Sequence, residues 1–204
     1  MTLLLTLALV ACGPSTTPDA PPPAAETPEP ASPPSATPPA PSEPDPANAT
    51  EAPTPATPTP CNLDAFVTDG DPKGLNVRDA PTTKGSTVLG QLPTTIDVML
   101  HVVASQDGWF KFDQAEDIMG ERAMPQAGWV SGTLLGTGVK NYGSLRTFHL
   151  YSAASSTSPV VGTPGEETVS LLACEGAWVK VKSGAGTGWL APEAQCPNPV
   201  TTCP

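Results

Sequence analysis

Positive charge is missing from the first part of this chain, and aromatic residues are scarce throughout it. No Lys or Arg occurs in residues 1–60, and the whole chain of 204 residues carries a formal net charge of −11. Aromatic residues make up 5% of the sequence, and all four tryptophans follow residue 100. Nucleic acids and anionic membrane surfaces bind mainly to a positive face, so this charge balance argues against both as the main partner.

Recognisable catalytic motifs are absent as well. The chain has two histidines, His101 and His149, and both lie in segments that we predict to be strands. A hydrolase with a Cys nucleophile needs a histidine placed beside it as a base. No G-x-S-x-G, H-E-x-x-H or phosphate-binding-loop motif occurs, although each of these would indicate a specific chemistry. We therefore expect a protein that is not an enzyme and that uses no cofactor.

A metal site is not expected either. Asp113, Glu116, Asp117 and Glu121 lie close together in the sequence, but they lack the alternate spacing and the central glycine of an EF-hand calcium loop. The cysteines contain no C-x2-C pair of the kind that holds zinc. The sequence therefore predicts neither calcium nor zinc.

Large apolar side chains are almost missing from residues 13–60, where 18 of the 28 prolines lie. Such a segment cannot bury enough surface to offset the entropy lost on ordering, so we expect a disordered, extended linker. We interpret it as a spacer that holds the rest of the chain away from a membrane. The alternative is a Pro-rich ligand for partner domains, which is disfavoured because no basic residue flanks any P-x-x-P.

Residues 1–12 contain a short apolar run from Leu3 to Val10. It is too short to span a bilayer, which takes about 20 residues, but it fits the apolar region of a secretion signal. The sequence Leu9-Val10-Ala11-Cys12 resembles a bacterial lipobox. The resemblance implies cleavage before Cys12, lipidation of its thiol and anchoring on the extracytoplasmic side of a bacterial membrane. The alternative is an ordinary signal peptide with an incidental cysteine.

Strand patterns begin after residue 60. The 144 residues that remain (204 minus 60) are enough for one ordinary domain or two small ones. In Leu75-Asn76-Val77-Arg78, apolar and polar residues alternate with the period of a half-buried strand. Further strands are predicted at residues 65–68, 88–93, 96–103, 108–112 and 128–130. Residues 113–126 form an acidic insertion between the last two.

A second, weaker copy of this pattern covers residues 149–191. His149-Leu150-Tyr151-Ser152 aligns with Asn76-Val77-Arg78-Asp79, and Val160-Val161-Gly162 aligns with Val88-Leu89-Gly90. Two tryptophan strands follow again, at residues 177–181 and 188–190. Residues 183–186 are a plain hairpin turn where the first copy carries its acidic insertion.

This order of elements resembles the bacterial SH3 (SH3b) domain. The residues that carry the resemblance are L-N-V-R-x-x-P at 75–81, V-L-G at 88–90 and G-W-V at 128–130. The resemblance implies an all-β fold of two small SH3-like β-barrels, residues 61–139 and 140–204, after the disordered linker. It also implies a binding module that docks on peptidoglycan or another envelope polymer. The alternative is a structural lipoprotein that binds an envelope protein through loops such as 113–126.

Seven side chains are candidates for ligand contact: Asn76, Arg78, Trp109, Trp129, Tyr151, Trp178 and Trp189. A tryptophan after a glycine can close the end of a small barrel by packing, or it can offer its ring face to a glycan or peptide. For Arg78, the alternative to ligand contact is an ion pair with Asp79 or another nearby acid. The second copy lacks the Asn-x-Arg pair, so this strand predicts a site only in the first copy.

With Cys12 assigned to the lipid, four cysteines remain, and this even number fits a secreted protein with two disulfides. Cys174 and Cys196 flank the tryptophan strands of the second copy. We therefore favour a Cys174–Cys196 bridge, with Cys61 paired to Cys203. The main alternative pairs Cys196 with Cys203 locally.

Overall fold

Alternating apolar and polar residues produce a protein of short antiparallel strands. A computed structural model of the chain describes residues 57–124, 126–140, 146–201 and 203. These residues form thirteen β-strands and two 3-10 helices, so the predicted all-β class is confirmed for the described part of the chain. None of its helices has the length and hydropathy needed to cross a bilayer.

The first seven strands are β1 (Thr59–Val67), β2 (Leu75–Arg78), β3 (Val88–Leu92), β4 (Val98–Gln106), β5 (Trp109–Asp117), β6 (Gly128–Ser131) and β7 (Leu135–Val139). The remaining six are β8 (Leu150–Tyr151), β9 (Val160–Gly162), β10 (Thr168–Glu175), β11 (Trp178–Ser183), β12 (Gly186–Leu190) and β13 (Gln195–Cys196). The 3-10 helices are η1 (Gly132–Leu134) and η2 (Pro192–Ala194), each directly before a strand.

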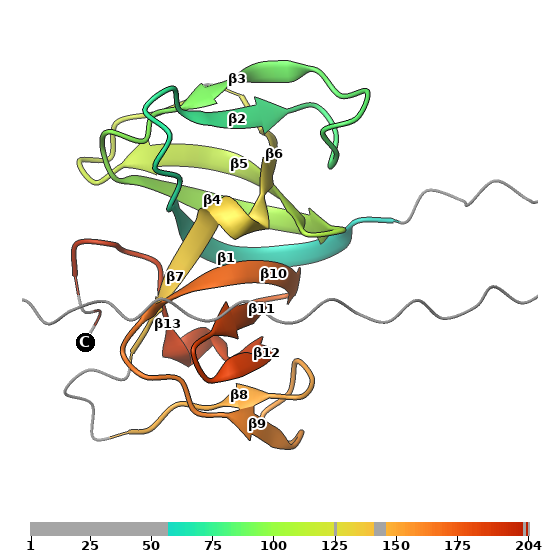
Figure 1. Cartoon of the computed structure of the whole chain (residues 1–204), viewed down its shortest axis with the longest axis vertical. Coiled ribbons are helices and arrows are strands. Elements are labelled where there is room, and N and C mark those ends of the chain that lie inside the picture. The colour runs from blue at the N-terminus through green and yellow to red at the C-terminus, as the bar shows by residue number, and fades with distance from the viewer. Residues whose placement is uncertain (1–56, 125, 141–145, 202, 204) are drawn as a thin grey trace, which may run out of the picture. The chain divides into compact units, whose positions relative to one another are not determined.

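All thirteen strands belong to one sheet, whose order is β3-β2-β6-β5-β4-β1-β7-β10-β11-β12-β8-β9, with β13 paired to β7. Figure 1 shows β1 and β10 side by side in the middle of the described part, with β2 and β3 at one end and β8 and β9 at the other. Outward from β1 the order is β4, β5, β6, β2 and β3, and outward from β7 it is the corresponding series β10, β11, β12, β8 and β9. The sheet is therefore built from two equivalent sets of strand pairs.

Strand β7 belongs to both sets. In the first repeat, which we define as β1 to β7, β1 pairs with β4 and with β7. In the second repeat, β7 to β13, β7 takes the place of β1 and pairs with β10 and β13. The last strand of the first repeat is thus the first strand of the second. The boundary predicted between residues 139 and 140 falls at the end of this shared strand.

One continuous apolar core runs through both repeats. The largest side chains in it with almost no exposed surface are Phe110, Phe112, Leu92, Leu100, Leu135, Leu150, Leu171 and Leu190. Along β4 the burial alternates residue by residue over most of the strand, as expected for a strand with one face on the core. Removal of this apolar surface from water is the main force that holds the sheet in its folded form.

In two of the Gly-Trp pairs, the glycine is required for steric reasons. A Cβ placed on Gly128 would lie 2.2 Å from a methyl carbon of Val77, and one on Gly188 would lie 2.8 Å from the Cβ of Leu150. Only glycine lets β6 approach β2, and β12 approach β8, this closely. Gly108 serves a different purpose, because it has a φ of +79° in the turn between β4 and β5.

Most predicted strands are confirmed, although several of their ends shift, most clearly in β1 and β5. Strand β1 begins at Thr59, inside the segment 13–60 that was predicted to be a linker, because Thr59 pairs with Ser105 of β4. Strand β5 continues to Asp117, so residues 113–117 belong to a strand and not to an inserted loop. The predicted signal peptide, Cys12 and residues 13–56 of the linker lie outside the described residues.

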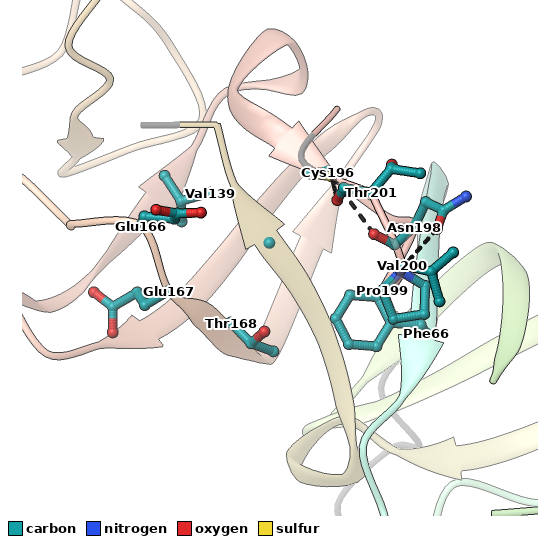
Figure 2. A pocket seen from close by; sticks show the side chains of 11 residues that line it. Phe66, Val139, Glu166, Glu167, Thr168, Cys196, Asn198, Pro199, Val200 and Thr201 are labelled. Atoms are coloured by element: carbon teal, nitrogen blue, oxygen red, sulfur yellow. Dashed lines mark hydrogen bonds between the residues drawn. The ribbon is translucent and has the colours of Figure 1, made fainter. Parts of the chain in front are cut away.

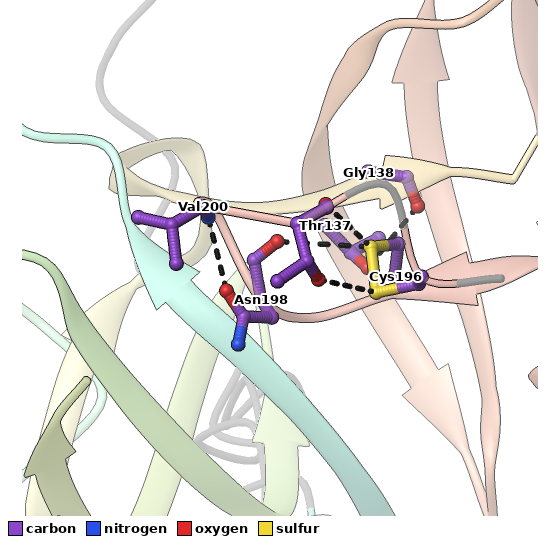
Figure 3. Close-up of a disulfide and its surroundings, with 7 residues drawn as sticks. Thr137, Gly138, Cys196, Asn198 and Val200 are labelled. Carbon is purple, nitrogen blue, oxygen red and sulfur yellow. Dashed lines mark hydrogen bonds between the residues drawn. A yellow bond between two sulfur atoms is a disulfide. The ribbon is translucent and has the colours of Figure 1, made fainter. Parts of the chain in front are cut away.

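The favoured disulfide pairing was wrong, and the alternative is the one found. Cys61 is bonded to Cys174, and Cys196 is bonded to Cys203, with Cα–Cα distances of 5.8 and 5.5 Å, both normal for disulfides. Cys196 lies opposite Gly138, and Gly138 lies opposite Thr168 on β10. Cys174 is six residues further along β10, a separation of about 20 Å along a strand. Cys196 therefore cannot reach Cys174 and is bonded to the C-terminal tail instead (Figure 3).

Candidate functional site

A groove of about 440 Å³ opens beside β2 in the first repeat. Its lining comes from the β1–β2 turn, β2, the β2–β3 loop, the start of β5, the end of β6 and η1. The lining residues are Asp69, Asp71, Gly74, Leu75, Asn76, Arg78, Thr83, Trp109, Ser131 and Leu134. Three of the seven predicted ligand-contact residues, Asn76, Arg78 and Trp109, therefore lie in one hollow.

Trp109 reaches this groove because of the turn before it. Asp107 and Gly108 have φ values of 51° and 79°, which is the conformation of a tight hairpin turn and is easiest for Asp-Gly or Asn-Gly. Trp109 is the first residue after the turn and pairs with Ser131 of β6. Its ring is only partly buried, so it contributes an accessible apolar surface to the groove.

Arg78 is held by the β2–β3 loop rather than by an acid. Its Nη1 donates a hydrogen bond to the Ser86 hydroxyl at 3.0 Å, and that hydroxyl donates to the carbonyl of Thr82. The carboxylate of Asp79 instead accepts a hydrogen bond from the Thr87 backbone N–H at 2.8 Å. The ion pair considered between Arg78 and Asp79 is thus not formed. The guanidinium has further donors for an acceptor in the groove.

Two acids form part of the lining. Asp69 and Asp71 lie in the β1–β2 turn, where one carboxylate oxygen of each accepts a backbone N–H two residues ahead, both at 3.0 Å. The turn ends at Gly74, which has a φ of +94°, and a Cβ there would lie 2.6 Å from the Leu92 carbonyl oxygen. Only glycine can make this turn into β2. The groove therefore carries both negative and positive side chains.

Apolar and neutral polar groups complete the site. Leu75 is almost fully buried at the groove. The side-chain oxygen of Asn76 accepts a hydrogen bond from Gln91 at 3.1 Å, which leaves the Asn76 amide nitrogen as a donor. The hydroxyls of Ser131 and Thr133 are hydrogen-bonded to each other at 3.0 Å. A ligand with a flat apolar face and several amide, hydroxyl or charged groups suits this lining.

The other four predicted residues lie elsewhere. Trp129 is 7% exposed and belongs to the buried residues, so the described surface offers little of its ring. Tyr151 and Trp178 contact each other in the second repeat, with ring centroids 5.7 Å apart and nearly perpendicular ring planes. Trp189 is half-buried on β12, opposite Tyr151. Asp69 and Asp71 were not among the predicted ligand-contact residues. Their Asp-x-Asp-Pro turn directly precedes β2 and could have indicated that they line the same site.

Two further hollows lie away from this groove. One of about 420 Å³ is bounded by Phe66, the β9–β10 connection with Glu166 and Glu167, and the tail residues 198–201. Figure 2 shows the two glutamates on one side of it and the tail on the other. The third hollow, about 190 Å³, contains the His101–Asp64 pair, whose Nδ1 and Oδ1 atoms are 2.9 Å apart. Among the described residues no group of three or more His, Cys, Asp or Glu could hold a metal ion.

Comparison with known proteins adds little to this geometry. No protein-family model matches the chain, and no curated protein matches it. Two solved structures, NlpC2 and NlpC1 from Trichomonas vaginalis, align with 68% and 71% of the chain at 14% and 16% identity, each with a TM-score of 0.27. The chain spans about half of their length, 48% and 47%. A likeness this weak carries no argument about fold or function.

Proposed function

We propose that this chain is a non-catalytic binding protein of a bacterial cell envelope. In this proposal the domains 61–139 and 140–204 are SH3-like β-barrels, and β7, the last strand of the first domain, also completes the second. The first repeat docks on peptidoglycan or another envelope polymer. The proposal extends the SH3b resemblance, and the repeated strand pairing supports it because both repeats carry the same order of strands around β7.

The observation that carries the proposal is the groove beside β2. It joins an accessible tryptophan, an arginine, an asparagine and two aspartates, which resembles a binding surface for a polymer with flat and amide-bearing units. An acidic protein gains little from charge alone on such a polymer, so stacking on Trp109 and hydrogen bonds from Asn76 and Arg78 supply the affinity.

The first quantitative test is retention on purified sacculi. We expect the protein without residues 1–12 to sediment with sacculi, and Trp109→Ala to weaken its binding by about 30-fold, because an aromatic anchor commonly contributes about 2 kcal/mol. The matched control is Trp178→Phe, which changes a tryptophan at the corresponding position of the second repeat. Equal retention of the Trp109→Ala variant and the parent protein would show that the groove is not the binding site.

The membrane anchor is the second element of the proposal. Lipidation of Cys12 would place the binding repeats on the extracytoplasmic side, and the Pro-rich segment would separate them from the bilayer. Two or more acyl chains on one cysteine anchor a protein durably, whereas a single chain gives only marginal binding. We expect globomycin to cause an uncut precursor to accumulate and labelled palmitate to appear in the untreated protein. Unchanged processing under globomycin, or an unlabelled protein, would contradict lipidation.

A second candidate function is docking on an envelope protein, and one feature of the first repeat favours it. The turn after β5 presents Ile118 and Met119, which are 46% and 81% exposed. The Asp117 carboxylate fixes this turn by accepting the N–H groups of Met119 and Glu121 at 2.8 and 2.9 Å. Cross-linking from position 119 in intact cells separates the two functions, because one discrete protein adduct favours a protein partner.

A further inference from the structure

The two repeats place corresponding side chains at corresponding positions. Arg78 lies opposite Trp129, and Tyr151 lies opposite Trp189. Trp109 follows the β4–β5 turn and pairs across it with Gln106, and Trp178 follows the β10–β11 turn and pairs with Glu175. By strand register, Tyr151 therefore corresponds to Arg78, and Trp178 corresponds to Trp109.

Hydrogen bonds support the same correspondence. Asn76 of β2 is bonded to Gln91, and His149, one residue before β8, is bonded to Thr163 at 2.9 Å across the matching pair of strands. At the next turn, the backbone N–H of Asp79 donates to Thr87 and that of Ser152 donates to Pro159. These bonds fix the register independently of the side chains under comparison.

The two repeats differ in where the matched side chain points. In the first repeat the loop draws Arg78 toward Ser86, with a 3.0 Å hydrogen bond, and the space between Arg78 and Trp109 belongs to the groove. In the second repeat Tyr151 instead places its ring against Trp178, at 5.7 Å between centroids. The serine of the second loop, Ser158, is bonded within that loop, to Ala153 and Ser155. The hydroxyl of Ser158 therefore serves its own loop, and the Tyr151 ring packs on the tryptophan.

We propose that the second repeat contains a closed copy of the ligand groove and that Tyr151 closes it. The inference rests on the proposed function for its ligand, the same envelope polymer that the first groove takes. Tyr151 is then the residue that limits the protein to one open site. With Tyr151 at the position of Arg78, the opened copy lacks that guanidinium and offers an apolar aromatic surface. It therefore favours the flat, uncharged part of the polymer.

The first measurement needs no ligand. In the full-length protein we expect Tyr151→Ala to increase acrylamide quenching of Trp178 by about twofold, because removal of the phenol ring uncovers a large aromatic surface. The Trp178 signal is isolated as the difference between Tyr151→Ala and the double variant Tyr151→Ala/Trp178→Phe. Tyr151→Phe is the matched control, since it keeps the ring and should leave quenching unchanged. Unchanged quenching in a folded Tyr151→Ala protein overturns the inference.

The second measurement uses purified sacculi. We expect Trp109→Ala to lose retention and Trp109→Ala/Tyr151→Ala to regain a measurable part of it through the opened second groove. Increased quenching without regained retention overturns the claim that the second repeat holds a ligand groove. If Trp109→Ala alone keeps full retention, the proposed function fails, and the quenching result still decides whether Tyr151 covers Trp178.

Discussion

Replacement of Cys61 and Cys174 by alanine together is expected to lower the free energy of unfolding by about 5 kcal/mol. The bridge joins residues 113 positions apart in the sequence, and a cross-link that closes so long a loop removes much entropy from the unfolded chain. For a chain of this size, such a loss corresponds to a fall in melting temperature of roughly 10–20 °C. Urea denaturation and thermal unfolding of the oxidised proteins measure it.

The surroundings of this bridge make a large effect reasonable. Both half-cystines are buried. The backbone N–H of Cys174 donates to the Ser105 hydroxyl at 3.1 Å, and the backbone N–H of Asn62 donates to the Gly176 carbonyl at 2.7 Å beside the bridge. The bond therefore joins β1 of the first repeat to the end of β10 in the second, where several strands meet.

The matched control is the double variant of Cys196 and Cys203. These cysteines are 7 residues apart, so the same entropy argument gives a loss of only about 2.5 kcal/mol. Their bridge attaches the C-terminal tail to β13 and does not join the two repeats. An equal or larger loss in this control than in the Cys61 and Cys174 variant would contradict the assigned pairing or its role.

Gly132→Ala is expected to lower the free energy of unfolding by about 3 kcal/mol. A Cβ at Gly132 would lie 2.4 Å from a ring carbon of Phe110 and 2.6 Å from the carbonyl oxygen of Leu171. Neither neighbour can move easily, because the Phe110 ring is fully buried and the carbonyl belongs to strand β10. One methyl group would force β5 and β10, strands of different repeats, apart at η1.

Gly165→Ala is the matched control, since nothing lies within 4 Å of a Cβ placed there and its φ is not in the left-handed region. We expect a change within about 0.5 kcal/mol for this exposed substitution. Chemical denaturation of both variants, measured side by side, decides the matter. A Gly132→Ala protein as stable as Gly165→Ala would show that η1 is less tightly packed between the repeats than the structure indicates.

Both predictions concern the contact between the two repeats, which share strand β7. Strand β7 pairs with β1, β10 and β13, so any change that separates the repeats also removes partners from β7. The buried residues of both repeats form one continuous cluster. We therefore interpret the described part as one cooperative unit, in which the groove of the first repeat is held rigid by packing against the second.

Local pattern predicted the strands well where alternation was regular. Leu75 to Arg78 forms β2 with the expected burial, and Gly128 and Gly188 mark close strand contacts. The end of β5 was missed because Asp113 and Glu116 are polar, whereas the pairing of this stretch with β4 makes it a strand. The polarity of a segment's side chains does not reveal whether its backbone pairs with a strand that is distant in the sequence.

The all-β class, the twofold repeat and three residues of the candidate groove could be predicted from local patterns, because period-2 alternation and glycine turns are local properties. The disulfide pairing, the sharing of β7, the burial of Trp129 and the contact of Tyr151 with Trp178 became known only from the folded chain. Each of these depends on strand register between segments that are distant along the chain. A one-residue change of register moves every side chain to the opposite face of the sheet, and no local pattern fixes that register across a whole sheet.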